Sequence, residues 1–318
     1  MQFMKTPIVR LRFVGIIGLI LSMIMIFNFS TLNLILFNFY AGFLGASHPV
    51  SKVGSIAIQN VVILINLSIL LISLVFLFFK EIKRLLSEFI DTEKAFRFFM
   101  TDEQCSKKQL PVFLFLIASA LGVFFNLFQL TFGEPAKEGF MEDNTTLLYV
   151  VAGIVLFIAA FLIKRDFFSK RERNTILILL FLLIVMLVFL FGEEVSWGQR
   201  VLGIKSVGVF QEYNYQKELN LHNFFNPLFK YAYPLAGMSF FVVLLFMWLF
   251  DKKDKPQLFY IFCPSRSLFF LAFFMAASTY HGHSEIFEEM VSVFSLLYSI
   301  RVFFCLRYPA AKTQLKLD

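Results

Sequence analysis

The feature that most constrains this chain is a long run of apolar residues, from 174 to 192, that contains no charged side chain. A helix needs about 20 apolar residues to cross a bilayer, and this run has that length. Similar runs recur along the chain. They cover residues 13–37, 56–79, 111–133, 147–164 and 230–250, and the stretch 267–306 has room for a seventh and an eighth helix. The sequence therefore predicts an all-α, polytopic transmembrane helix bundle of about eight spans.

The composition excludes a soluble domain of ordinary kind. Of the 318 residues, 58% are hydrophobic, 46 are Phe and only 16% are charged, whereas soluble domains carry about 25% charged residues. A soluble core of this size could not hide so much apolar surface. We expect residues 1–318 to form one integral membrane domain whose main partners are membrane lipids, with no role for nucleic acid.

The basic residues predict the orientation. Most of the 29 Lys and Arg side chains lie in alternate loops, at 1–12, 80–110, 164–173, 251–266 and 301–318. An excess of Lys and Arg marks the cytoplasmic side, so both termini are expected in the cytoplasm. Charged and apolar residues alternate in 80–110, which predicts a cytoplasmic amphipathic loop lying on the membrane.

Two other topologies compete with eight spans. Residues 1–30 resemble a signal peptide, but the apolar stretch is too long and no small-residue cleavage site ends it promptly. A seven-span arrangement would make 267–290 one helix and would leave basic residues such as Arg301 and Arg307 outside. A re-entrant hairpin for the last two helices stays open.

The first polar cluster closes the run that ends at 192. Its candidate catalytic residues are Glu193, Glu194, Ser196, Gln199 and Arg200. If the helix continues, Glu193, Ser196, Trp197 and Arg200 share one face, and Glu193 lies near Arg200. Carboxylates at the edge of the hydrocarbon usually pair or serve a function. The competing interpretation is a hydrated helix end with Trp197 in the aromatic belt.

The second cluster follows in the extracytoplasmic polar loop predicted at 193–229. Residues 211–223 are rich in hydrogen-bonding groups and end with the candidates His222 and Asn223. Taken alone, a loop histidine is more often a surface residue than a ligand. A separate sequon at Asn144-Thr145-Thr146 has meaning only in a eukaryotic secretory pathway.

The third cluster lies between the last two expected helices. The apolar runs 267–280 and 290–300 are each shorter than a full span, so crossing the bilayer should draw the polar residues between them below the surface. The candidate catalytic residues there are Glu285, Glu288 and Glu289. His222, His281, His283 and Glu285 are candidate ligands for a divalent metal such as Zn²⁺, although no named metal motif is present. A polar turn facing water is the alternative.

Two blocks of sequence carry a resemblance. GEEVSWGQR at 192–200, followed by QKELNLHN at 216–223, resembles a GEExSWGQR / QxExNLHN motif pair of uncharacterised bacterial polytopic membrane proteins. The resemblance implies a multi-pass protein of the bacterial inner membrane and brings no activity with it.

Three classes of function fit these observations. A membrane-embedded hydrolase or transferase acting on a lipid or lipid-linked substrate would use the Glu and His side chains at the extracytoplasmic face. A transporter or proton-coupled carrier is a second class, although carriers often have internal repeats and sites near the midplane. A non-catalytic assembly or scaffold protein is the third, with the polar loops as its docking surface.

Overall fold

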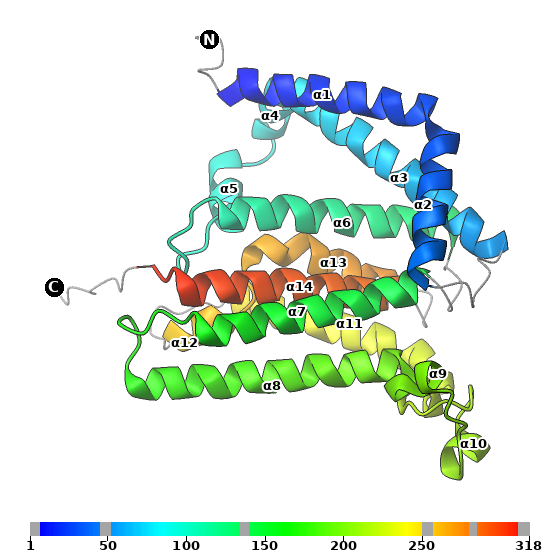
Figure 1. Cartoon of the computed structure of the whole chain (residues 1–318). Coiled ribbons are helices and arrows are strands. Elements are labelled where there is room, and N and C mark those ends of the chain that lie inside the picture. Colours follow the sequence, from blue (N-terminus) through cyan, green and yellow to red (C-terminus); the bar gives the residue numbers. More distant parts are fainter. Residues whose placement is uncertain (1–6, 45–51, 134–139, 250–256, 280–284, 311–318) are drawn as a thin grey trace. The chain divides into compact units, whose positions relative to one another are not determined.

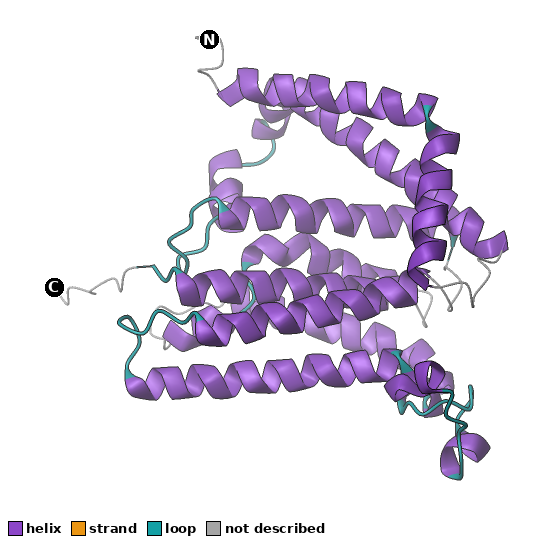
Figure 2. Ribbon diagram, in the orientation of Figure 1, coloured by secondary structure: helices purple, strands orange, loops and turns teal. Residues whose placement is uncertain are grey.

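The computed structural model describes residues 7–44, 52–133, 140–249, 257–279 and 285–310. Every regular element in these ranges is a helix, as Figures 1 and 2 show, and an isolated bridge between Cys105 and Pro309 is the one β contact found there. The predicted all-α fold is confirmed for this part of the chain.

Six helical segments of the described residues are long and apolar enough to cross a membrane. They are α6 (Leu110–Phe132), α7 (Phe140–Phe161), α8 (Lys170–Glu194), α11 (Asn226–Leu249), the broken segment 258–278 formed by α12 (Gln257–Phe262), η3 (Arg266–Leu268) and α13 (Phe269–Ser278), and α14 (Glu285–Arg307). The chain is therefore a multi-pass integral membrane protein.

The last two spans are longer than the sequence predicted. The segment that ends at Ser278 begins at 258 and not at 267, because α12 and η3 continue it towards the N-terminus. The final helix begins at Glu285 and runs past Arg301 to Arg307. Glu285, Glu288 and Glu289 all lie in the first turns of α14, and their position below the membrane surface stays a prediction.

The chain divides into two compact units, Met1–Phe98 with Phe124–Phe140, and Phe99–Val123 with Met141–Asp318. The first unit contains α1 (Pro7–Phe27), α2 (Phe29–Leu44), α3 (Lys52–Leu77) and α4 (Phe79–Ser87), and α5 (Thr92–Met100) begins in it. The second unit contains both the candidate site and the helices from α7 onwards.

The first predicted span, 13–37, is not one straight helix. The helices over Leu11–Phe27 and Phe29–Phe39 meet at an angle of 81°. Asn28 lies at the break, and its side-chain amide donates to the carbonyl of Ile24 at 2.8 Å. Such local side-chain bonds compete with the helical ladder, and an apolar pattern alone cannot reveal them.

Small and polar side chains join α1 to α3 in the first unit. A Cβ atom on Gly15 would lie 2.8 Å from the carbonyl oxygen of Ser73. Ser22 donates its hydroxyl hydrogen to Asn66 at 2.7 Å. Close backbone approach at small residues, with a hydrogen bond across the pair, is the usual way in which helices associate in lipid.

The second unit is packed around α14, the most buried of its membrane-spanning helices. Ile286 and Met290 on α14 have no exposed surface, and neither has Leu271 on α13. On α7 and α8, Leu156 and Ile176 are at most 1% exposed. The outward faces are apolar as well, which is how helices that face lipid differ from soluble ones.

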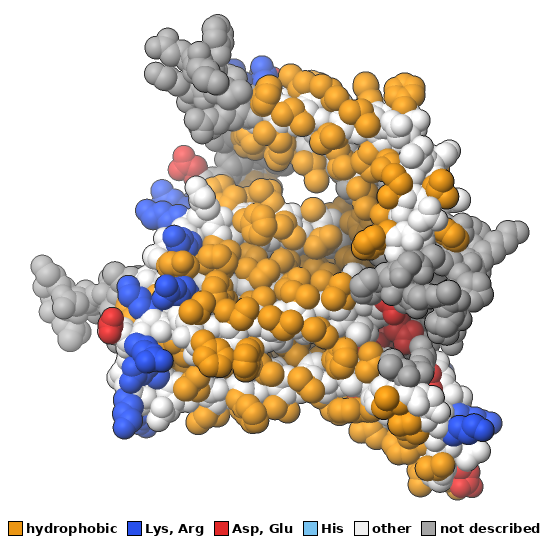
Figure 3. Space-filling model, in the orientation of Figure 1, with side chains coloured by type: hydrophobic (Ala, Val, Ile, Leu, Met, Phe, Trp, Pro, Cys, Tyr) orange, Lys and Arg blue, Asp and Glu red, His pale blue; other side chains and the backbone are white. Residues whose placement is uncertain are grey.

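Charge is distributed unevenly over this unit. Figure 3 shows hydrophobic side chains along the helices and basic side chains gathered at the end that carries the α7–α8 loop. Lys164, Arg165, Lys170 and Arg171 belong to this end. The helix α8 starts there in a capping box, in which Glu172 N–H donates to Ser169 Oγ at 3.2 Å and Ser169 N–H to Glu172 Oε2 at 2.7 Å.

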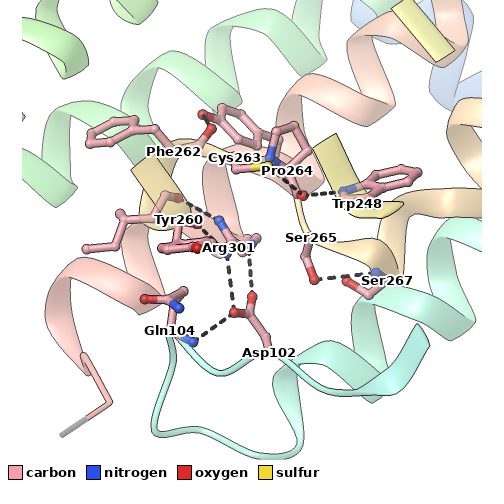
Figure 4. A network of polar contacts seen from close by, with 12 residues as sticks. Asp102, Gln104, Trp248, Tyr260, Phe262, Cys263, Pro264, Ser265, Ser267 and Arg301 are labelled. Atoms are coloured by element: carbon pink, nitrogen blue, oxygen red, sulfur yellow. Dashed lines mark hydrogen bonds and ion pairs between the residues drawn. The ribbon is translucent and has the colours of Figure 1, made fainter. Parts of the chain in front are cut away.

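Arg301 is not a solvated loop charge, as the sequence had suggested. It lies within α14, and its Nε donates to Asp102 Oδ2 at 2.6 Å, with both side chains less than 5% exposed. The guanidinium also donates to the carbonyls of Tyr260 and Ile261, at 3.0 and 2.6 Å. Figure 4 shows Arg301 between Asp102 and Tyr260. Five donors in a fixed fork suit Arg to bridge such groups.

Candidate functional site

The helix α8 ends at Glu194 because the next residues leave helical geometry. Ser196 and Trp197 have positive φ angles of 48° and 52°, a region that side chains other than Gly seldom adopt. The turn folds the Trp197 ring back over Gly192, where a Cβ atom would lie 2.8 Å from the ring carbons. The predicted continuous face through Glu193, Ser196, Trp197 and Arg200 is therefore wrong.

Glu193 connects this helix end to the loop that follows. Trp197 Nε1 donates to its Oε1 at 2.8 Å, and the backbone N–H of Leu221 donates to its Oε2 at 2.7 Å. The carboxylate is only 6% exposed. Both of its oxygens hold protein groups in place, which is a structural role, and the Arg200 side chain lies outside the described part of the chain.

A second set of bonds surrounds Glu218. Its Oε2 accepts from Ser196 Oγ at 3.0 Å, from Asn220 Nδ2 at 2.9 Å and from Asn223 Nδ2 at 3.1 Å. Asn220 also donates to Ser196 Oγ at 3.0 Å, and Asn223 to Gln216 Oε1 at 2.6 Å. Ser196, Asn220 and Asn223 have at most 1% of their surface exposed. Glu218 itself is half-buried, and its carboxylate, with three donors, is a satisfied acceptor.

Gln199 holds the middle of the same loop. Its amide donates to Ser206 Oγ at 2.8 Å, and its Oε1 accepts from the backbone N–H of Leu219 at 2.6 Å. Asn214 arranges the next turn, since its Oδ1 accepts from the N–H groups of Gln216 and Glu218 at 3.0 and 3.1 Å. These bonds replace those that irregular backbone lacks.

The two motif blocks are thus one hydrogen-bonded structure. Three residues of the first block bind the second block: Glu193 binds Leu221, Ser196 binds Glu218, and Gln199 binds Leu219. Asn223 binds Gln216 within the second block. The sequence had named all four as catalytic candidates, and the geometry gives each a fold-stabilising contact. Glu218 and Asn220, the centre of the network, were absent from the predicted site.

A different polar group gathers at the start of α14. Glu289 has no exposed surface and accepts a hydrogen bond from Thr145 Oγ1 at 2.6 Å and another from Asn144 Nδ2. Glu288 accepts a hydrogen bond from the hydroxyl of Tyr233 on α11. The side chains of Asn144 and Thr145 belong to α7, so three helices contribute to this group.

Electrostatic interactions extend the group to α8. Tyr149 interacts with the charges of Glu194, Glu288 and Glu289. Tyr233 interacts with Glu194, Glu285 and Glu288. Four carboxylates from two helices therefore lie within electrostatic range of two phenols. We call Glu194, Glu285, Glu288, Glu289, Tyr149 and Tyr233 the carboxylate–tyrosine cluster.

Sequence reasoning missed the neutral members of this site. Asn144 and Thr145 had been considered only as part of a sequon, and Tyr149 and Tyr233 were not singled out. One signal was present, because Asn144, Thr145 and Thr146 interrupt the start of an apolar span. Polar residues at such positions usually face protein and not lipid.

The proposed metal ligands are only partly described. His281 and His283 lie outside the described residues, and so does the side chain of His222. Glu285 is described and 8% exposed. Among the described residues, no three His, Cys, Asp or Glu side chains are arranged to hold a metal ion. The zinc site stays a prediction that depends on the three histidines.

The chain was also compared with known proteins. No family model matches it, and neither a curated protein nor a solved structure is significantly similar to it.

Proposed function

We propose that this protein is a membrane-embedded enzyme that acts on a lipid or lipid-linked substrate, with the carboxylate–tyrosine cluster as its acid–base centre. One observation carries the proposal: at the start of α14, Glu288 accepts a hydrogen bond from the Tyr233 hydroxyl of α11, and the neighbouring Glu289 accepts from Asn144 and Thr145 of α7. Ionisable groups within spans are costly and normally mark a site.

The roles within the cluster follow from the hydrogen bonds. The Tyr233 hydroxyl donates to Glu288, so a proton can pass between a phenol and a carboxylate that already touch. Proton transfer by a positioned side chain is the basis of general acid–base catalysis. Glu288 is therefore the proposed acid–base residue, with Glu194 and Glu285 next to it. Glu289, held by Asn144 and Thr145, would fix the geometry.

Glu193, Ser196, Gln199 and Asn223 take a supporting part in this proposal. Their bonds hold the loop after α8 against the helix end that carries Glu194. His222 follows Leu221, whose N–H binds Glu193, so its backbone lies close to the same helix end. A divalent metal bound through His222, His281 or His283 would add a Lewis acid to this site.

The orientation is part of the same proposal. Basic residues gather at the end of the unit opposite the acidic cluster, and such residues favour the cytoplasm. We therefore place the cluster at the extracytoplasmic face, with about eight spans and both termini in the cytoplasm. The resemblance of the paired motifs to bacterial proteins favours the inner membrane.

Lipid profiles of whole cells test the proposal. Lipids and lipid-linked glycans would be extracted from cells that lack the protein and from cells that express wild type, Glu288→Gln or Glu194→Gln, then compared by mass spectrometry. Glu212→Gln is the matched control, because Glu212 is an exposed carboxylate on α10 (Val209–Tyr213) outside the cluster.

The enzyme proposal requires that one lipid species accumulates in the null cells and in the Glu288→Gln cells, while wild type and Glu212→Gln restore the normal profile. Membrane fractions probed for the protein must contain equal amounts of each variant. If null and wild-type profiles coincide, the proposal fails, and transport of ions or solutes becomes the next function to assay.

A further inference from the structure

The connector between α8 and α11, residues 195–225, is folded with its polar groups inside. Its buried side chains, among those that the structure describes, are all polar: Ser196, Ser206, Asn214, Asn220 and Asn223. In a loop surrounded by water, the apolar side chains would be the buried ones. The connector reverses that rule.

One stretch of its outer surface, 202–209, is mostly apolar. Leu202, Val207 and Val209 are 69%, 70% and 61% exposed, and Ile204 is exposed beside them. Figure 3 shows hydrophobic side chains over the part of the unit where α9 (Gln199–Leu202) and α10 lie. Gly203 and Gly208, with φ near +60°, turn the chain between them. Exposed apolar patches of this kind mark an interaction surface.

We propose that this surface lies in the headgroup layer of the bilayer, with Leu202, Val207 and Val209 inserted at the boundary of the acyl chains. The connector begins where α8 ends and leads into α11, so its apolar surface continues the lipid-facing side chains of two membrane-spanning helices. The inference is independent of the proposed catalysis, since it concerns the outside of the connector and not the carboxylate–tyrosine cluster.

Three further exposed side chains fit the same layer. Tyr213 and Tyr215 are 63% and 65% exposed, and tyrosines are enriched where a membrane meets water because one end of the ring is apolar and the other polar. Lys205 is exposed within the apolar stretch, and lysine stems lie along apolar surface while their charge reaches headgroups. Both residue types are typical of segments that rest on a bilayer.

The buried polar network explains how irregular backbone can lie there. Backbone groups near hydrocarbon find little water, so they must be satisfied within the protein. Gln199 and Asn214 supply such partners to the N–H groups of Gln216, Glu218 and Leu219. The network thus allows the connector to present side chains, and not bare backbone, to lipid.

Figure 1 shows that the connector does not simply extend the helix axes. The segment with α9 and α10 is displaced sideways past the end of α8. A segment displaced across the helix direction runs along the membrane surface, whereas one directed along the axes would leave it. This placement favours lipid over water as the neighbour of Val207 and Val209.

Quenching by brominated lipids tests the inference. Trp248→Phe leaves Trp197 as the one native tryptophan of the chain, which has two. In that background, Val207→Trp or Val209→Trp would report on the apolar surface. Gln211→Trp would be the matched control, because Gln211 is exposed and lies two residues after Val209, on the other side of α10. Each full-length protein would be reconstituted in lipids brominated on their acyl chains. Acrylamide in the buffer is the opposing quencher.

The inference requires that bromine reduces the added fluorescence of Val207→Trp and Val209→Trp at least about twofold more than that of Gln211→Trp, and that acrylamide shows the reverse order. Acrylamide quenching of both valine positions, without bromine quenching, would mean that the surface faces water and would overturn it. Shielding from both quenchers would mean that a protein partner or a second copy covers the surface, which would also overturn it.

Discussion

Arg301 and Asp102 form a buried ion pair across 199 positions of sequence, with Nε 2.6 Å from Oδ2. The same guanidinium binds the carbonyls of Tyr260 and Ile261, just before the break that precedes α13. One side chain of α14 therefore fixes both the segment ahead of α6 and the start of the preceding span. Gln104 N–H, which donates to Asp102 at 3.0 Å, holds the carboxylate in turn.

Asp102→Ala should destabilise the second unit strongly. Removal of one partner leaves a buried charge uncompensated, which costs about 3–5 kcal/mol. Heating detergent-solubilised protein and measuring the monodisperse fraction by size-exclusion chromatography would report a lower midpoint. Lys94→Met is the control, because the Lys94–Asp91 pair is exposed, at 86% and 52% of the two side chains. It should leave the midpoint unchanged. An equal midpoint for Asp102→Ala and wild type would contradict the role given to the pair.

Asn220→Ala should loosen the connector while leaving the helices folded. The Asn220 side chain donates to Ser196 and Glu218, and its Oδ1 accepts from Asn214 at 3.3 Å. Unsatisfied buried partners cost about 1–3 kcal/mol. Trypsin should then cut faster after Lys205 and Lys217, which flank the buried bonds. Gln211→Ala, at an exposed position of α10, should be cut at the wild-type rate. Identical rates for both variants would show that the network does not hold the connector.

Thr145→Val should weaken the attachment of α7 to α14. The substitution keeps the shape of the side chain but removes the hydroxyl that donates to Glu289 Oε2 at 2.6 Å, at a cost of about 1–3 kcal/mol. Unfolding of each variant in graded detergent mixtures would measure this loss of stability. Thr146→Val is the neighbouring control and should have little effect, while Thr145→Ser should restore stability because it returns the hydroxyl. Failure of Thr145→Ser to do so would assign the loss to packing.

The membrane helices were predictable because the requirement for a span is local. A run such as 174–192 must be helical to satisfy its backbone in lipid, and α8 covers it. The end of that helix was not predictable, because it depends on positive φ angles at Ser196 and Trp197 that no propensity favours. The prediction that Glu193 lies near Arg200 relied on a helix that continues beyond Glu194.

Contacts between residues far apart in the sequence were the other feature that could not be predicted. The alternation of loops between the two sides of a membrane predicted that the acidic residues lie at one end of the bundle. It could not show that Glu289 binds Asn144 and Thr145, or that Glu218 is the centre of the connector network. Such pairs depend on which helices become neighbours, and one sequence does not record that.

Gly192→Ala should displace the turn that ends α8. A Cβ atom there would lie 2.8 Å from two carbons of the Trp197 ring, closer than atoms of a packed interior approach one another, so the indole must move. Its bond to Glu193 at 2.8 Å would then lengthen or break, and the tryptophan emission should shift.

Gly153→Ala is the matched control, since nothing lies within 4 Å of its Cβ position on α7. In a helix interior, Ala is favoured over Gly by up to about 1 kcal/mol, so the control should be neutral or slightly stabilising. Because both changes add the same methyl group to a membrane helix, a difference between them measures the contact with Trp197. Identical emission and stability for the two variants would mean that the indole does not pack on Gly192.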